Sequence, residues 1–156
     1  MSAMTTHEIE EARTLAEALG MTDELAEAIA RVAADELGAG RPDPARVILE
    51  GLVVANPRAV GAWMLLARVH RALGQPLAAR FCAEVAGSLA PGEADARLAR
   101  AEGLLPFPED RAEARALLTG LANEDGDAGE RARSLLTAIG GSAKPMNRPL
   151  NQAPGA

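Results

Sequence analysis

Apolar residues recur along this chain at the three- and four-residue spacings of amphipathic helices, in segments that glycine and proline interrupt. The first segment runs from Thr5 to Leu19. Thr5 and Glu8 have the spacing of a capping box, and Gly20 supplies a stop signal. One face of this predicted helix carries three large apolar residues, Ile9, Leu15 and Leu19. We expect this face either to cap the helices that follow or to pair with a second copy of the chain.

Several positions recur at one fixed interval along the chain. Alanine does so at Ala33, Ala67 and Ala101, and three further pairs keep the same interval: Gly40 and Gly74, Ala45 and Ala79, and Pro57 and Pro91. The interval is the period of the tetratricopeptide repeat, a helix–turn–helix unit of about 34 residues that stacks on its own copies. The sequence therefore predicts an all-α tetratricopeptide-repeat superhelix of about three repeats, with one further helix at each end.

The predicted repeats span Ala26–Ala59, Val60–Glu93 and about Ala94–Asn123. Small residues in phase have a mechanical reason, since antiparallel helices about 8–10 Å apart need Ala or Gly where their backbones come closest. In the third repeat Ala114 arrives one residue late, which indicates one inserted residue in the turn. A final helix, about Ala128–Ile139, is expected to cover the end of the stack.

This organisation divides the chain into three parts. Residues 1–20 form the N-terminal helix for dimerisation or capping, residues 21–140 form the repeat domain, and residues 141–156 form a tail with three prolines that we expect to be disordered.

The amino-acid composition excludes several classes of fold and ligand. Hydrophobic residues make up 48% of the chain but aromatic residues only 2%, which favours close-packed helices over a β-sandwich. The formal net charge of −6 leaves no basic stripe for phosphate contacts, so a nucleic-acid ligand is not expected. Cys82 is alone, which excludes a disulfide within one chain. With neither a signal-peptide pattern nor an apolar run of about 18 residues, we expect a cytoplasmic protein.

No set of side chains in the sequence predicts catalysis or metal binding. His7 and His70 lack metal-ligand spacing with each other and with Cys82, and His70 is expected to be a partly exposed packing residue. No glycine elbow accompanies Ser88 or Ser134. The acidic segment 124–127 lacks the ligand alternation of a calcium loop. We therefore expect a protein that is not an enzyme and that needs neither a metal ion nor a cofactor.

The remaining candidate site is a groove, because the first helices of stacked repeats line one concave surface. The repeat phase places nine residues there: Ala30, Ala34, Leu37, Met64, Arg68, Arg71, Leu98, Glu102 and Leu105. This mixture of apolar and charged residues suits an extended or helical peptide with apolar anchors. The alternative for each position is that it belongs to the core between repeats.

The repeat block resembles a known family, the class II chaperones of type III secretion (the SycD/LcrH type), over roughly Val32 to Ile139. The resemblance rests on three motifs and on the short last helix, Ser134 to Ile139; the motifs are Gly40-x4-Ala45-x3-Leu49, Leu73-Gly74-Gln75-x3-Ala79 and Ala101-Glu102-x-Leu104-Leu105. It implies an N-terminal helix used for dimerisation and a groove that holds an extended segment of a hydrophobic translocator. Carried over, Ala34, Leu37, Met64 and Leu105 would line that groove. Ala34 and Leu37 stand where the family usually has aromatic residues.

We therefore expect a non-enzymatic cytoplasmic chaperone that holds a secreted, translocator-like client in its groove. The alternative is an adaptor that joins folded proteins in a complex. A chaperone would protect an extended segment from protease, whereas an adaptor would dock an already folded surface.

Overall fold

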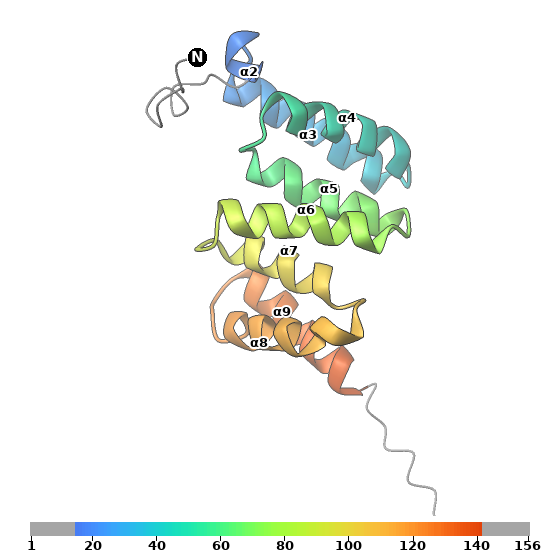
Figure 1. The fold of residues 1–156 in the computed structure, drawn as a ribbon, viewed down its shortest axis with the longest axis vertical. Helices are drawn as coiled ribbons and strands as arrows, with labels where there is room; N and C mark the ends of the chain where they lie inside the picture. Colours follow the sequence, from blue (N-terminus) through green and yellow to red (C-terminus); the bar gives the residue numbers. More distant parts are fainter. Residues whose placement is uncertain (1–14, 142–156) are drawn as a thin grey trace, which may run out of the picture.

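The computed structural model describes residues 15–141, and this part of the chain is helical throughout, with no strand (Figure 1). Its elements are α2 (Leu15–Ala18), α3 (Asp23–Gly38), α4 (Pro42–Ala55), α5 (Val60–Ala72), α6 (Pro76–Leu89), α7 (Ala94–Leu104), a 3-10 turn η1 (Pro108–Asp110), α8 (Arg111–Leu121) and α9 (Asp127–Gly141). The predicted all-α class is confirmed. Most of the predicted N-terminal helix and nearly all of the predicted tail lie outside the described residues.

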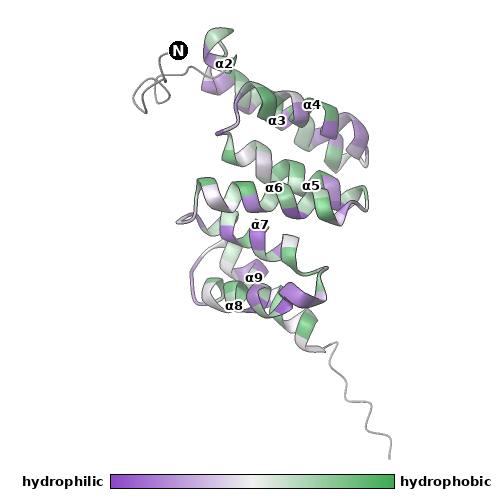
Figure 2. Ribbon diagram, viewed as in Figure 1, coloured by the Kyte–Doolittle hydropathy of each residue, from purple (hydrophilic) through white to green (hydrophobic). Residues whose placement is uncertain are grey.

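The helices stack as consecutive antiparallel pairs, α3 with α4, α5 with α6 and α7 with α8, and α9 packs on α8 (Figure 1). The first helices also contact one another: α3 touches α5, α5 touches α7, and α7 touches α9. They therefore form one layer, and α9 extends that layer beyond the third pair. Figure 2 shows hydrophobic and hydrophilic residues alternating along the helices, as helices with one packed face require.

Small residues in repeat register occupy the contacts between helices. Ala33, Ala67 and Ala101 are all buried. A second buried series comprises Ala45, Ala79 and Ala114, in which the second interval is longer than the first by a single position. Because Ala114 takes the place in α8 that Ala79 takes in α6, the extra residue falls in the third turn, as the sequence indicates.

The first two repeats turn on glycine. Gly40 and Gly74 have φ values of 75° and 69°, a left-handed conformation that favours glycine. In both turns the N–H of the next residue reaches back to the helix, Arg41 to the Glu36 carbonyl and Gln75 to the His70 carbonyl, each at 2.9 Å. This is the Schellman ending of a helix. The third turn has no residue with positive φ and passes through η1 instead.

Two sequence expectations need correction. His70 is buried, with only 8% of its surface exposed, and not partly exposed. The turn after α5 brings Gln75 back over it, and His70 Nδ1 donates to Gln75 Oε1 at 2.7 Å. The last helix also runs through Gly140 and Gly141 instead of ending at Ile139. Neither glycine has the positive φ that ends the helices at Gly40 and Gly74, so the helix continues through both.

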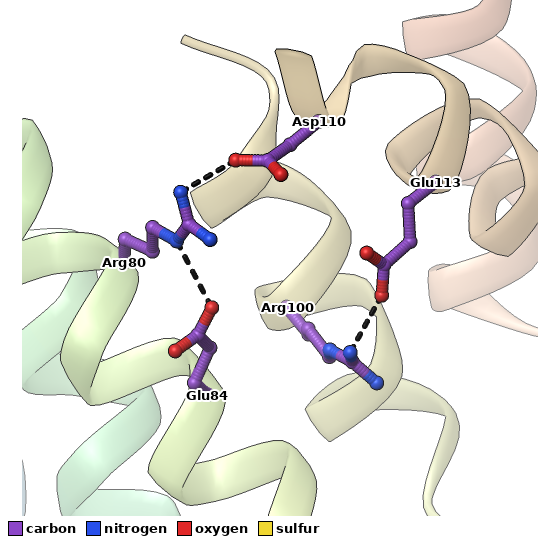
Figure 3. A network of polar contacts seen from close by, with 5 residues as sticks. All are labelled: Arg80, Glu84, Arg100, Asp110 and Glu113. Atoms are coloured by element: carbon purple, nitrogen blue, oxygen red, sulfur yellow. Dashed lines mark hydrogen bonds and ion pairs between the residues drawn. The ribbon is translucent and has the colours of Figure 1, made fainter. Parts of the chain in front are cut away.

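Ion pairs also connect the helices in the distal half of the stack. Arg80 of α6 bonds both Glu84 and Asp110, and Arg100 of α7 bonds Glu113 of α8 (Figure 3). Arg97 of α7 makes two bonds to Glu124, in the loop before α9. The Arg97 bonds lower the pKa of Glu124. The stabilisation from this pair is therefore fully present above the ordinary pKa of glutamate, and it is lost as the pH falls from there through the lowered pKa.

We predict that Ala67→Phe lowers the free energy of unfolding by about 1–3 kcal/mol, because it overpacks a buried contact between helices. Urea unfolding measures the loss. Ala72→Phe, at an exposed position on the same helix, should cost far less. Equal losses for the two variants would contradict a role for residue size at position 67.

Candidate protein-binding groove

An open cavity of about 750 Å3 lies along the layer of first helices. Its walls come from α3, α5 and α7, and Arg131 of α9 closes one end. The lining residues are Glu27, Ala30, Arg31, Ala34, Gly61, Met64, Leu65, Arg68, Arg71, Asp95, Leu98, Ala99, Glu102 and Arg131. A volume of this size is sufficient for several side chains of a bound segment.

The repeat register arranges the lining in rows that cross the three helices. The middle of the groove is apolar, with Ala30, Met64 and Leu98 at equivalent positions of successive repeats, next to Leu65 and Ala99. Each row contains one residue from each repeat, so the rows run along the stack. A chain segment lying in the groove would therefore meet one apolar residue per repeat.

Charged residues flank this apolar row on both sides. Three residues before it on each helix stand Glu27, Gly61 and Asp95, which make an acidic edge. Four residues after it stand Ala34, Arg68 and Glu102, joined by Arg71 and Arg131. Seven residues separate the two edges on each helix, which corresponds to about 10 Å along the helix axis.

Glu102 is the central carboxylate of the second edge. Only 11% of its side chain is exposed. It accepts a hydrogen bond from Arg71 Nη1 at 2.5 Å and another from Arg131 Nε at 3.1 Å. These bonds tie α7 to α5 on one side and to α9 on the other. They neutralise a nearly buried charge, and they hold two arginines in fixed positions at the rim of the groove.

Two other arginines of the groove are differently placed. Arg31 and Arg68 are exposed, and the side chain of neither makes a hydrogen bond or ion pair with any residue between 15 and 141. Their guanidinium groups are therefore available to a ligand.

Of the nine residues predicted for the groove, seven line the cavity. Leu37 and Leu105 do not: Leu37 packs against the core cluster of α3 to α6, and Leu105 against that of α7 to α9. They fit the alternative that some positions belong to the core between repeats. Each stands three residues after the charged edge, near the end of its helix, where the chain turns back over the core.

Sequence reasoning missed seven lining residues: Glu27, Arg31, Gly61, Leu65, Asp95, Ala99 and Arg131. Six of them could have been found, because each lies three residues before a predicted lining residue and so shares its helix face. Glu27, Gly61 and Asp95 precede Ala30, Met64 and Leu98 in this way, and Arg31, Leu65 and Ala99 precede Ala34, Arg68 and Glu102. Arg131 carries no such signal, since α9 lies beyond the repeat phase.

The structure describes two of the three residues predicted for dimerisation. Ile9 lies outside the described residues. Leu15 and Leu19 are 50% and 69% exposed, whereas Ala16 between them is buried where α2 contacts α4. The exposed pair leaves an apolar surface at the N-terminal end of the stack.

Reactive chemistry has little support in this part of the chain. Residues 15–141 contain no group of three or more His, Cys, Asp or Glu side chains that could hold a metal ion. Burial raises the pKa of the Cys82 thiol to about 11, so it carries almost no thiolate at neutral pH. No helix in this region is long and apolar enough to cross a membrane.

Solved structures share this fold. The chain is similar to the type III secretion translocator chaperone SycD of Yersinia enterocolitica, with a TM-score of 0.70 and 22% identity over 82% of this chain and 99% of that one. A type III secretion complex from Aeromonas hydrophila gives a TM-score of 0.68 and 21% identity over 86% of this chain and 93% of that one. SycD in complex with a peptide of the translocator YopD gives a TM-score of 0.64 and 22% identity over 80% of this chain and 98% of that one. No family model and no curated protein matches the sequence. These likenesses establish the shared helical-repeat fold.

We predict that Glu102→Gln lowers the free energy of unfolding by about 1–3 kcal/mol, because it removes a nearly buried charge that two arginines share. Urea unfolding checks this. Glu130→Gln is the control, since Glu130 is exposed on α9 and its side chain makes no ion pair with residues 15–141. A loss no larger than that of the control would show that the network does not stabilise the fold.

Proposed function

We propose that this protein is a non-enzymatic chaperone of the type III secretion class, working in the cytoplasm. It holds an extended apolar segment of a secreted, translocator-like client in the groove. The observation that carries the proposal is the apolar row of Ala30, Met64 and Leu98, which repeats along an open cavity. The similarity to SycD, which has been solved with a translocator peptide, supports the same use of the fold.

The energetics of this binding are modest but sufficient. Full burial of one large apolar side chain stabilises a complex by about 1.5–3 kcal/mol. A micromolar complex requires about 8 kcal/mol in net terms, after the costs of association and ordering. Several client side chains must therefore be buried together, one opposite each repeat. No aromatic residue lines the cavity, so binding depends on aliphatic contacts and on the charged edges.

A second use of the fold has an observation of its own. Val47 and Val54 of α4 and Leu77 and Phe81 of α6 are exposed, and Val47 and Phe81 occupy equivalent positions in successive repeats. These residues belong to the layer of second helices and do not line the groove. An apolar surface of this kind suits an adaptor that docks a folded partner.

We predict that Met64→Asp abolishes the soluble co-expression of a client encoded near this gene, because it places a charge in the middle of the apolar row. Soluble client is measured by pull-down after co-expression, and circular dichroism checks that the variant is folded. Leu77→Asp, outside the groove, is the matched control. If Leu77→Asp abolished the complex and Met64→Asp did not, the adaptor surface would be the binding site.

We also propose that the N-terminal apolar surface pairs two copies of the chain. Leu15→Asp with Leu19→Asp should then yield a monomer of 16.1 kDa where the unaltered protein has twice that mass, as measured by light scattering. Leu77→Asp should leave the mass unchanged. A monomeric unaltered protein would mean that this surface only caps the stack.

A further inference from the structure

The groove differs in charge from the molecule that carries it. The chain as a whole has a formal net charge of −6, whereas the cavity is lined by four arginines and three carboxylates. The excess positive charge is concentrated on one edge. Arg68, Arg71 and Arg131 stand there against a single carboxylate, Glu102. A ligand approaching this edge meets a positive potential on an otherwise acidic protein.

Glu102 does not neutralise the whole edge. Both of its oxygens are already engaged, one by Arg71 and the other by Arg131. Arg68 is left without an ion pair among residues 15–141, one helical turn from Arg71 and one turn from Met64. A guanidinium group held beside a second one gains most from an anionic ligand, since each arginine raises the potential at the other.

The acidic edge is less concentrated. Glu27 lies on α3 and Asp95 on α7, so the whole of α5, with Gly61 at the equivalent position, separates the two carboxylates. Arg68 and Arg71, by contrast, lie on a single helix. The stronger electrostatic preference of the groove is therefore for a negative charge at the Arg68 edge.

We propose that the groove selects a client segment that carries an Asp or Glu one or two residues from the apolar side chain seated on Met64. This inference rests on the proposed function and specifies its ligand. Arg68 lies one helical turn from Met64, about 5–6 Å to the side of a client that runs along the stack, and an extended client advances about 3.3 Å per residue. A carboxylate one or two positions from the anchor thus stays within reach of the long, exposed Arg68 side chain.

The chain's own C-terminal residues do not have this chemistry. Residues 142–156 include Lys144 and Arg148 and contain no Asp or Glu. They would add positive charge to an edge that already has an excess of it. The N-terminal sequence Glu8-Ile9-Glu10 does have this chemistry, but we assign Ile9 to the surface that is proposed to pair two copies of the chain. We therefore commit to a segment of another protein as the occupant.

The test uses 12-residue peptides with one leucine anchor, in which the residues one and two positions from the anchor are Asp, Asn or Lys. Fluorescence anisotropy measures their affinity for the full-length protein. We expect the Asp peptide to bind about three- to tenfold more tightly than the Asn peptide, and the Lys peptide to bind more weakly than both. High salt should reduce the preference.

The variants assign the preference to one residue. Arg68→Gln should bind the Asp and Asn peptides equally. Arg115→Gln is the matched control, because Arg115 is an exposed arginine of α8, outside the groove, with no ion pair to residues 15–141. It should retain the full preference. A preference that survives Arg68→Gln would overturn the proposal, and so would a peptide copy of residues 1–14 or of residues 142–156 that binds as tightly as the Asp peptide.

Failure of this inference and failure of the proposed function give different results. If Asp and Asn peptides bind equally, and Met64→Asp abolishes the binding of both, the acidic preference is wrong while the groove remains the binding site. If no peptide binds, or if Met64→Asp changes nothing, both the inference and the proposed function fall.

Discussion

The close approach of neighbouring helices is the constraint from which the rest of this structure follows. Alanine at 33, 67 and 101 and again at 45, 79 and 114 lets the helices pack at short range. Gly103 is an extreme case, since a Cβ there would meet the Ala83 Cβ at 3.0 Å, where α7 crosses α6. Because these contacts fix the rotation of each helix about its axis, they also decide which residues face the groove.

The two halves of the stack satisfy this constraint by different means. The helices α3 to α6 bury a large aliphatic cluster, whereas α7 to α9 bury a smaller one with Leu118 and Leu121 at its centre. Bonds from arginine to carboxylate connect α7 with α5, α8, α9 and the Glu124 loop. Exposed pairs of this kind each contribute less than about 1 kcal/mol, so the partly buried Glu102 is the member that matters most.

The sequence predicts well those features of the fold that depend on the conformation or the size of a single residue type. Glycine at 40 and 74 ends a helix because only glycine adopts the left-handed conformation readily, and alanine in register marks a close contact. Whether a side chain faces the groove or the core is harder to predict near helix ends. Leu37 and Leu105 keep the phase of the groove but turn onto the core, and His70 is buried by a residue five positions later. Arg131 lines the groove from a helix outside the repeats, so the periodicity of the sequence does not predict it.

Affinity and selectivity come from two parts of the groove that lie at different positions along the helix axes. Its apolar row supplies contacts that any aliphatic segment can use, and without aromatic side chains each contact is shallow. Such a surface by itself would bind many unfolded chains weakly. The arginine edge adds a requirement that depends on position, because a carboxylate gains its full interaction only at the correct distance from the anchor. Under the proposed function, a client held by several shallow contacts and one charge pair is retained in an extended form and is released one side chain at a time.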